Sequence, residues 1–237
     1  MTSPFLERLA DRARRPYGTL LFTLTSMLAL YPFLGGYRVL SWLFDFILFA
    51  VVVAALQSVY SRGTVYRLGW VLGILTFCSG FLGRSVGLEE AYALSVGLRS
   101  VFFAYLIVVI CGDIFRRDEV TFDAVMGASC VLVLIGLTFG SIFTLLEWHA
   151  PGSFSFPAPS AATDSSHGRL VAEFDLVYFS FVTLTTTGYG DIVPVAAPVR
   201  GLASLEGLVA QLYLTIMIAR LVGLEIARRY EATGGRK

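Results

Sequence analysis

The segment Thr183–Pro194 reads TLTTTGYGDIVP. Two glycines, Gly188 and Gly190, flank Tyr189, and a run of threonines precedes them. Glycine adopts positive φ without the steric cost that a Cβ imposes, whereas β-branched side chains stiffen the chain. The sequence on both sides is apolar. The segment therefore predicts an irregular but well-defined backbone in a hydrophobic environment.

The composition is that of a membrane protein. The chain has 237 residues, of which 56% are hydrophobic and 15% are charged, and its mean hydropathy is +0.74. About a quarter of the residues in soluble domains are charged. The net charge of +1 suggests no nucleic acid or acidic partner, so we expect the lipid bilayer to be the main surroundings of this chain.

Long apolar stretches recur along the chain. A membrane-spanning helix needs about 20 mostly apolar residues. Six stretches meet this criterion: 17–35, 40–60, 66–83, 91–112, 123–147 and 201–224. A seventh, 172–187, is too short to span and ends in the glycine-tyrosine-glycine strip. Irregular backbone at membrane depth must be covered by protein or water. We therefore predict an all-α integral membrane protein with six spans and one re-entrant segment.

Basic residues gather at alternate connections. One set precedes the first span, joins the second to the third and the fourth to the fifth, and follows the last: Arg8, Arg12, Arg14, Arg15, Arg62, Arg67, Arg116, Arg117, Arg228, Arg229, Arg236 and Lys237. The other connections carry only Arg38, Arg84, Arg169 and Arg200. Because cytoplasmic loops are enriched in Arg and Lys, we expect both termini in the cytoplasm and the strip to open outward. The first span lacks an A-x-A-like cleavage site and is expected to be retained in the cell (inner or plasma) membrane.

The strip resembles the selectivity filter of potassium channels, whose core is written T-V-G-Y-G-D. Residues Thr186–Asp191 supply T-T-G-Y-G-D, with a threonine at the usual valine position. Upstream, Thr183 and Thr185 match the T-x-T-T extension of that motif. The resemblance is strong over 172–224 and only architectural over the first four spans. It implies a pore helix, a filter and an inner helix around a symmetry axis.

The resemblance also implies the roles of the strip residues. The K⁺ ligands would be the carbonyls of Thr186, Thr187, Gly188 and Tyr189 within the Thr186–Gly190 core, with the Thr186 hydroxyl at the innermost site. Rings of such oxygens can replace the hydration shell of a cation. One copy supplies a quarter of each ring, so we expect a homotetramer, with K⁺ as the permeant ligand and no other cofactor. The Tyr189 ring is expected to point into an aromatic set: Tyr178, Phe179 and Phe181.

Other residues are expected to support the filter. They are Thr183, Thr185, Asp191, Glu206 and Glu147. Asp191 would hydrogen-bond behind the strip. Glu206 lies within the last span, where an acid is costly unless it is paired or wetted, so we expect it to bond the back of the pore helix. Glu147, at the outer end of the fifth span, either braces the pore helix or is solvated.

The last span carries a stripe at spacings of four, three and four residues: Gln211, Thr215, Ile218 and Val222. If this stripe faces the symmetry axis of the tetramer, it would line a cavity that is polar below the filter and apolar toward the cytoplasm. An apolar constriction can gate by dewetting, so Ile218 and Val222 are gate candidates; alternatively, the stripe only packs. The hinge glycine of the family falls at Ala210, and Gly207 is the candidate to replace it.

The fourth span argues against steep voltage gating. It contains Arg99 as its one basic residue, and one charge crossing 100 mV contributes about 2.3 kcal/mol. We expect a degenerate sensor-like domain over 1–115, a linker over 116–123, a pore domain over 124–224 and a short tail over 225–237. Arg99 is expected to be fixed, either paired with Asp45 or snorkelling to water.

Three functions are compatible with these patterns. The first is passive K⁺ conduction by a homotetramer. The alternatives are a weakly selective cation channel and a non-conducting regulatory or sensor subunit with a channel-like fold. The sequence offers no metal cluster, phosphate loop or nucleophile arrangement that would indicate an enzyme. Cys78, Cys111 and Cys130 lie scattered in apolar runs and are expected to be packing residues.

Overall fold

The computed structural model describes residues 16–34, 63–86, 89–116, 121–156 and 167–234. Its elements are, in chain order, α2 (Pro16–Leu34), α4 (Thr64–Val86), α5 (Glu89–Arg116), α6 (Phe122–His149), β1 (Phe154–Ser155), α7 (His167–Leu184), β2 (Val193–Pro194) and α8 (Ala197–Gly234). The second expected span, 40–60, and Asp45 within it lie outside the described residues.

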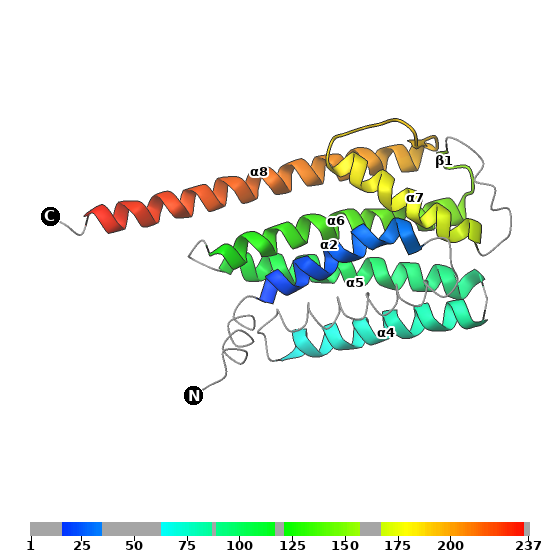
Figure 1. Cartoon of the computed structure of the whole chain (residues 1–237), viewed down its shortest axis with the longest axis horizontal. Coiled ribbons are helices and arrows are strands. Elements are labelled where there is room, and N and C mark those ends of the chain that lie inside the picture. Colours follow the sequence, from blue (N-terminus) through cyan, green and yellow to red (C-terminus); the bar gives the residue numbers. More distant parts are fainter. Residues whose placement is uncertain (1–15, 35–62, 87–88, 117–120, 157–166, 235–237) are drawn as a thin grey trace.

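The helices follow the apolar stretches of the sequence. Four of them, α4, α5, α6 and α8, are long and apolar enough to cross a membrane, and α2 contains a shorter apolar segment, Tyr17–Leu30. The chain is thus an all-α, multi-pass membrane protein. The largest difference from expectation is at α8, which begins before residue 201 and continues to Gly234, through most of the expected tail. Figure 1 shows this helix projecting beyond the others.

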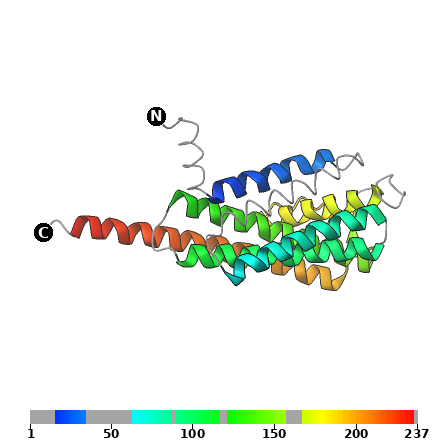
Figure 2. The ribbon, with the colours of Figure 1, turned by 90° about the horizontal axis from the view of Figure 1, so that it is seen from below.

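Helix α6 is the centre of the bundle. It contacts α2, α5, α7 and α8, while α4 packs on α5. Figure 2 shows α2 along the upper edge of the bundle. Thr121 caps the start of helix α6: its hydroxyl accepts the Ala124 N–H at 3.1 Å, which satisfies one free backbone donor of the first turn.

One hydrophobic core joins the two expected domains. It combines Leu20 of α2, Phe102 and Leu106 of α5, and Leu134 of α6 with side chains of α7 and α8. Residues 117–120 of the expected linker, 116–123, lie outside the described residues. The helices on either side of it, α5 and α6, bury apolar faces against each other. Helix α6 already begins at Phe122, inside that expected linker.

Helix α7 and the strip after it lie where the re-entrant segment was expected. The helix starts at His167, before the expected boundary at 172, and ends at Leu184. The chain then turns back to β2, which pairs antiparallel with β1 through Phe154↔Pro194 and Ser155↔Val193. Figure 1 shows the strip returning from the inner end of α7 to the end of the molecule that carries β1. The start of α7 and the end of the strip therefore lie at the same end of the bundle.

Candidate functional site

The sign of the backbone dihedral φ alternates along the strip. Thr186, Gly188 and Gly190 have φ of +58°, +61° and +77°, whereas Thr187 and Tyr189 are not among the residues with positive φ. Positive φ is uncommon for a residue with a Cβ, above all a β-branched one, and Thr186 is the one described non-glycine residue that adopts it. Alternation of this kind directs successive peptide oxygens toward the same side of the strip.

The N–H groups at the start of the strip are held by the end of α7. Thr186 donates to the Thr183 carbonyl at 3.0 Å, and Thr187 donates to the Val182 carbonyl at 2.9 Å. Gly188 shares that Val182 oxygen at 3.4 Å. These bonds use the free carbonyls that end every helix. Within the described part of the chain, no donor bonds a carbonyl of 186–190, and 185–191 are exposed in the protomer. The strip therefore presents a row of unbonded peptide oxygens.

The threonine that departs from the family motif makes a specific contact. The Thr187 hydroxyl lies 2.9 Å from the Thr185 hydroxyl. Thr185 in turn donates to the Phe181 carbonyl at 2.7 Å. A valine at position 187 could not make this bond. Thr183 contributes its backbone carbonyl to the strip, as described above, and its side chain is half-buried.

Tyr189 stacks on Tyr178. The two ring centroids are 6.5 Å apart and the planes differ by 3°, although 72% of Tyr189 is exposed in the protomer. The Tyr178 hydroxyl donates to Asp191 at 2.9 Å, so Asp191 bonds the pore helix behind the strip as expected. The expected aromatic set is otherwise wrong, since Phe179 packs on Phe143 at 5.4 Å.

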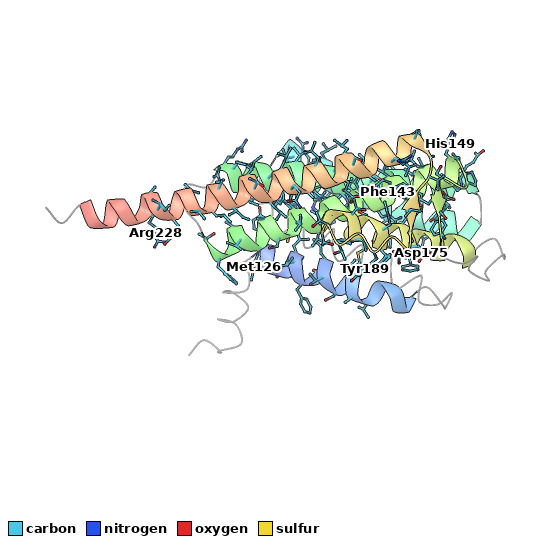
Figure 3. The ribbon with its side chains drawn as sticks, turned by 90° about the horizontal axis from the view of Figure 1, so that it is seen from above. Met126, Phe143, His149, Asp175, Tyr189 and Arg228 are labelled. Carbon is cyan, nitrogen blue, oxygen red and sulfur yellow. The ribbon has the colours of Figure 1, made fainter. Side chains whose placement is uncertain are left out.

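Two acids lie near this tyrosine pair. Burial raises the pKa of Asp175, and the negative charge of Asp191 raises it further. The hydrogen bond to Asp191 is the first cause of a raised pKa at Tyr178. Figure 3 labels Asp175 and Tyr189, with His149 at the far end of α6. Asp175 and Asp191 therefore lie close enough for the charge of one to disfavour ionisation of the other.

Two glycines of α6 allow α7 to pack closely against it. A Cβ on Gly136 would lie 2.9 Å from the ring of Phe181, and a Cβ on Gly140 would lie 2.9 Å from the Cα of Val177. Gly136 and Gly140 lie one turn apart, as do Val177 and Phe181, so two matched turns of α6 and α7 touch closely. Phe181 thus points to α6 and not to Tyr189, which corrects the expected aromatic set a second time.

Glu206 is fully buried behind α7. Its carboxyl group contacts the hydroxyl of Ser180, which also donates to the Gly136 carbonyl at 2.7 Å. The second carboxyl oxygen, Oε2, has no hydrogen-bond partner among the described residues. Glu206 therefore joins α8, α7 and α6 at one point, at the back of the pore helix where the sequence led us to expect it.

Glu147 has a different role from either expectation. Its carboxylate accepts the N–H of Gly152 at 2.8 Å and the N–H of Phe154 at 3.0 Å. It thereby closes the turn after its own helix instead of bracing α7. The acid is needed there because the first residues after a helix carry backbone donors that lack helical partners.

The stripe on α8 faces away from the protomer core. Gln211, Thr215, Ile218 and Val222 are all exposed, with Ile218 at 60% and Val222 at 52%. Ala210 lies on the opposite, buried face and packs in the core. Gly207 is half-buried, a Cβ there would meet nothing, and α8 is unbroken through both hinge candidates. The helix thus runs without interruption through both positions.

Sequence reasoning missed the partner of Arg99. The guanidinium forms a buried salt bridge with Glu173 of α7. The expected partner, Asp45, lies outside the described residues. The signal was an acid, Glu173, in the first half of an apolar helix. It also missed Arg220 of α8, which donates to the carbonyls of Ile114 and Phe115 at 3.0 Å each.

Comparison with known families supports a channel domain. Residues 131–224 match a family model described as "Ion channel". The match covers α7, the strip and most of α6 and α8. No curated protein and no solved structure matched the chain significantly. Residues 131–224 of this membrane protein are therefore similar to an ion-channel family, which is not a family of enzymes.

Proposed function

We propose that this protein conducts K⁺ passively and selectively as a homotetramer, with the strip 186–190 as its selectivity filter. The observation that carries the proposal is the alternating backbone at Thr186, Gly188 and Gly190. Channel filters bind dehydrated cations through rings of backbone carbonyls. A strip whose first N–H groups point into its own pore helix leaves its carbonyls for such a ring.

The choice of K⁺ rests on the sequence of the strip. The order Thr-Thr-Gly-Tyr-Gly-Asp is similar to the potassium-channel motif, and the Tyr189 ring packs on a tyrosine that bonds Asp191. That tie supports the outer end of the strip from behind. Thr187, which replaces the usual valine and bonds Thr185, is the feature that favours the weakly selective alternative.

The proposal of a fourfold assembly rests on the apolar surface of α8 and the strip residues that are exposed in a single copy. Within the protomer, 11% of the apolar window of α8 is buried, compared with 61% for α6. The strip is also exposed over 185–191. Four copies around an axis would place the strips opposite one another and line a cavity with the stripe Gln211, Thr215, Ile218 and Val222.

We also propose that both termini are cytoplasmic, because the arginines gather at the connections on that side.

The decisive experiment is ion flux through purified protein in liposomes. Under a K⁺ gradient we expect flux, and in mixed K⁺ and Na⁺ we expect a reversal potential close to that of K⁺. Comparable Na⁺ flux would instead support the weakly selective channel, and no flux from protein that is folded and tetrameric by native mass would support the non-conducting subunit. Either result would end the present proposal.

A matched pair of glycine variants tests the strip itself. Gly188→Ala and Gly152→Ala both place a Cβ on a residue with positive φ, +61° and +85°, and neither Cβ meets a neighbouring atom within the protomer. Each substitution is expected to cost about 1 kcal/mol of backbone strain. Only Gly188→Ala is expected to abolish selective K⁺ flux. Equal flux from the two variants would remove the strip from the conduction path.

A further inference from the structure

Helix α5 holds the pore helix through one side chain of α7. Arg99 pairs with Oε1 of Glu173, and the Tyr92 hydroxyl donates to Oε2 at 2.7 Å. Tyr92 and Arg99 lie seven residues apart, two turns along the same face of α5. Both oxygens of the Glu173 carboxylate are therefore bonded by a single helix, α5.

This contact is shielded from solvent. The side chains of Arg99 and Glu173 are 8% and 5% exposed. A buried ion pair is a weak source of net stability, but loss of one partner leaves an uncompensated charge in a medium of low dielectric. Loss of either partner is therefore costly, and we expect the pair to stay formed. An arginine bound in this way is not free to cross a membrane field.

The position of Glu173 determines what the contact controls. Glu173 lies in the first half of α7, and the strip starts directly after the other end of that helix. The second half of α7 is seated by Gly136 and Gly140 of α6 and by the Ser180–Glu206 contact. Since a short helix transmits a displacement at one end to the other, its first half also needs an anchor.

We propose that Arg99, Tyr92 and Glu173 are positioning residues for the ion-binding strip, which α5 holds in register through the first half of α7 of the same chain. The inference rests on the proposed function of the strip. It assigns the one arginine of the expected fourth span to a fixed brace of the pore and not to a voltage sensor. We name this contact the α5 brace.

The test compares Arg99→Met, Glu173→Gln and the double variant Arg99→Met/Glu173→Met with the unaltered protein. Arg67→Met is the matched control, since Arg67 is an exposed arginine of α4. We expect each single change to lower the K⁺/Na⁺ permeability ratio about tenfold, as small displacements of reacting or coordinating atoms do. The double variant should recover part of that loss because it leaves no buried charge. Tyr92→Phe should have a smaller effect.

A second measurement separates this proposal from the proposed function. A filter that binds K⁺ raises the thermal stability of the folded protein as K⁺ increases. We expect this rise in the unaltered protein and in Arg67→Met, and a smaller rise in Arg99→Met. If the unaltered protein shows neither K⁺ flux nor K⁺-dependent stabilisation, the proposed function fails.

The α5 brace fails on different results. Wild-type permeability ratios and wild-type K⁺-dependent stabilisation in both single variants would overturn it. So would independent effects of the two single changes on Tm in K⁺-free buffer, because residues in contact must show coupling. A reduced voltage dependence of open probability in Arg99→Met would show that the arginine moves, which also contradicts the brace.

Discussion

Thr186 occupies a backbone conformation that threonine seldom adopts, and the cost is offset by its surroundings. Its φ is +58°, and its N–H is bonded to the Thr183 carbonyl at the end of α7. Strain of this kind persists only where the neighbouring structure holds the residue in place. A β-branched residue locked in this way keeps the strip from relaxing to an ordinary extended chain.

At the mouth of the strip, Tyr178 is the residue whose hydroxyl is most directly testable. Tyr178→Phe keeps the ring stacked on Tyr189 but removes the donor to Asp191. The loss is expected to be about 1 kcal/mol per protomer, the net worth of an ordinary hydrogen bond. We expect lower thermal stability and a faster decline of K⁺ flux in liposomes.

The control for this change is Tyr66→Phe. Tyr66 is an exposed tyrosine of α4 that packs on Trp70 through its ring. Its loss of a hydroxyl should leave both measurements unchanged. A Tyr178→Phe protein with the stability and flux of the unaltered chain would show that Asp191 does not depend on this bond.

At the scale of elements, the spacing of glycines on α6 sets how closely α7 can approach. Small residues at a helix interface allow backbones to approach closely in a membrane. Gly136 and Gly140 give Phe181 and Val177 of α7 that approach. The pair of helices then carries the contact from Ser180 to Glu206 of α8. A small number of contacts therefore fixes α6, α7 and α8 relative to one another, and the position of the strip depends on all three helices.

Gly140→Ala tests this seat. The new Cβ would lie 2.9 Å from the Cα of Val177, and a backbone atom cannot rotate away. Overpacking of this kind costs about 1–3 kcal/mol. We expect reduced thermal stability and loss of selective flux, because α7 must move away from α6 and the strip moves with it.

Gly112→Ala is the matched control for the seat. A Cβ on Gly112 of α5 would meet nothing within the protomer. Alanine is better than glycine in a helix by about 1 kcal/mol, so this variant should be as stable as the unaltered protein or more so. If the two alanine variants behaved alike, close approach at Gly140 would not be what positions α7.

At the scale of the whole molecule, α5 contacts the expected pore domain at two places, one on α7 and one on α8. Arg99 bonds Glu173 on α7, and at the other end of α5 the carbonyls of Ile114 and Phe115 accept from Arg220 of α8. The Arg220 guanidinium also lies 4.8 Å from the centroid of the Phe115 ring. A cation at the C-terminus of a helix satisfies free carbonyls and interacts favourably with the helix dipole.

Arg220→Met tests the second of these contacts. Arg220 lies on α8 between the gate candidates Ile218 and Val222. Loss of its bonds to α5 is expected to cost about 1 kcal/mol and to free this part of α8, so single-channel open probability should change while the K⁺/Na⁺ permeability ratio stays the same. Recordings in planar bilayers measure both quantities.

Arg228→Met is the control for Arg220. Arg228 is exposed on the part of α8 that projects beyond the other helices, as Figure 3 shows. It should leave open probability unchanged. An altered permeability ratio in Arg220→Met would contradict the separation of the two contacts, since it would mean that the strip depends on this contact.

The sequence by itself determined the membrane class, and it predicted the re-entrant segment and the stripe on α8. Each of these follows from local periodicity: apolar runs of span length, two glycines around Tyr189, and a spacing of three or four residues. Local patterns report which backbone a segment can adopt and which of its faces is apolar. They were sufficient to expect Glu206 behind the pore helix, because a buried acid in a span needs a polar neighbour.

Only the tertiary structure decided which distant side chains meet. Arg99 pairs with Glu173, Glu147 bonds its own turn, Phe181 meets Gly136, and Arg220 bonds the end of α5. Each partner lies on another helix or in a turn, and its approach depends on how closely two helix surfaces pack. Those distances arise from the whole bundle, since removal or addition of one methyl group shifts an entire helix.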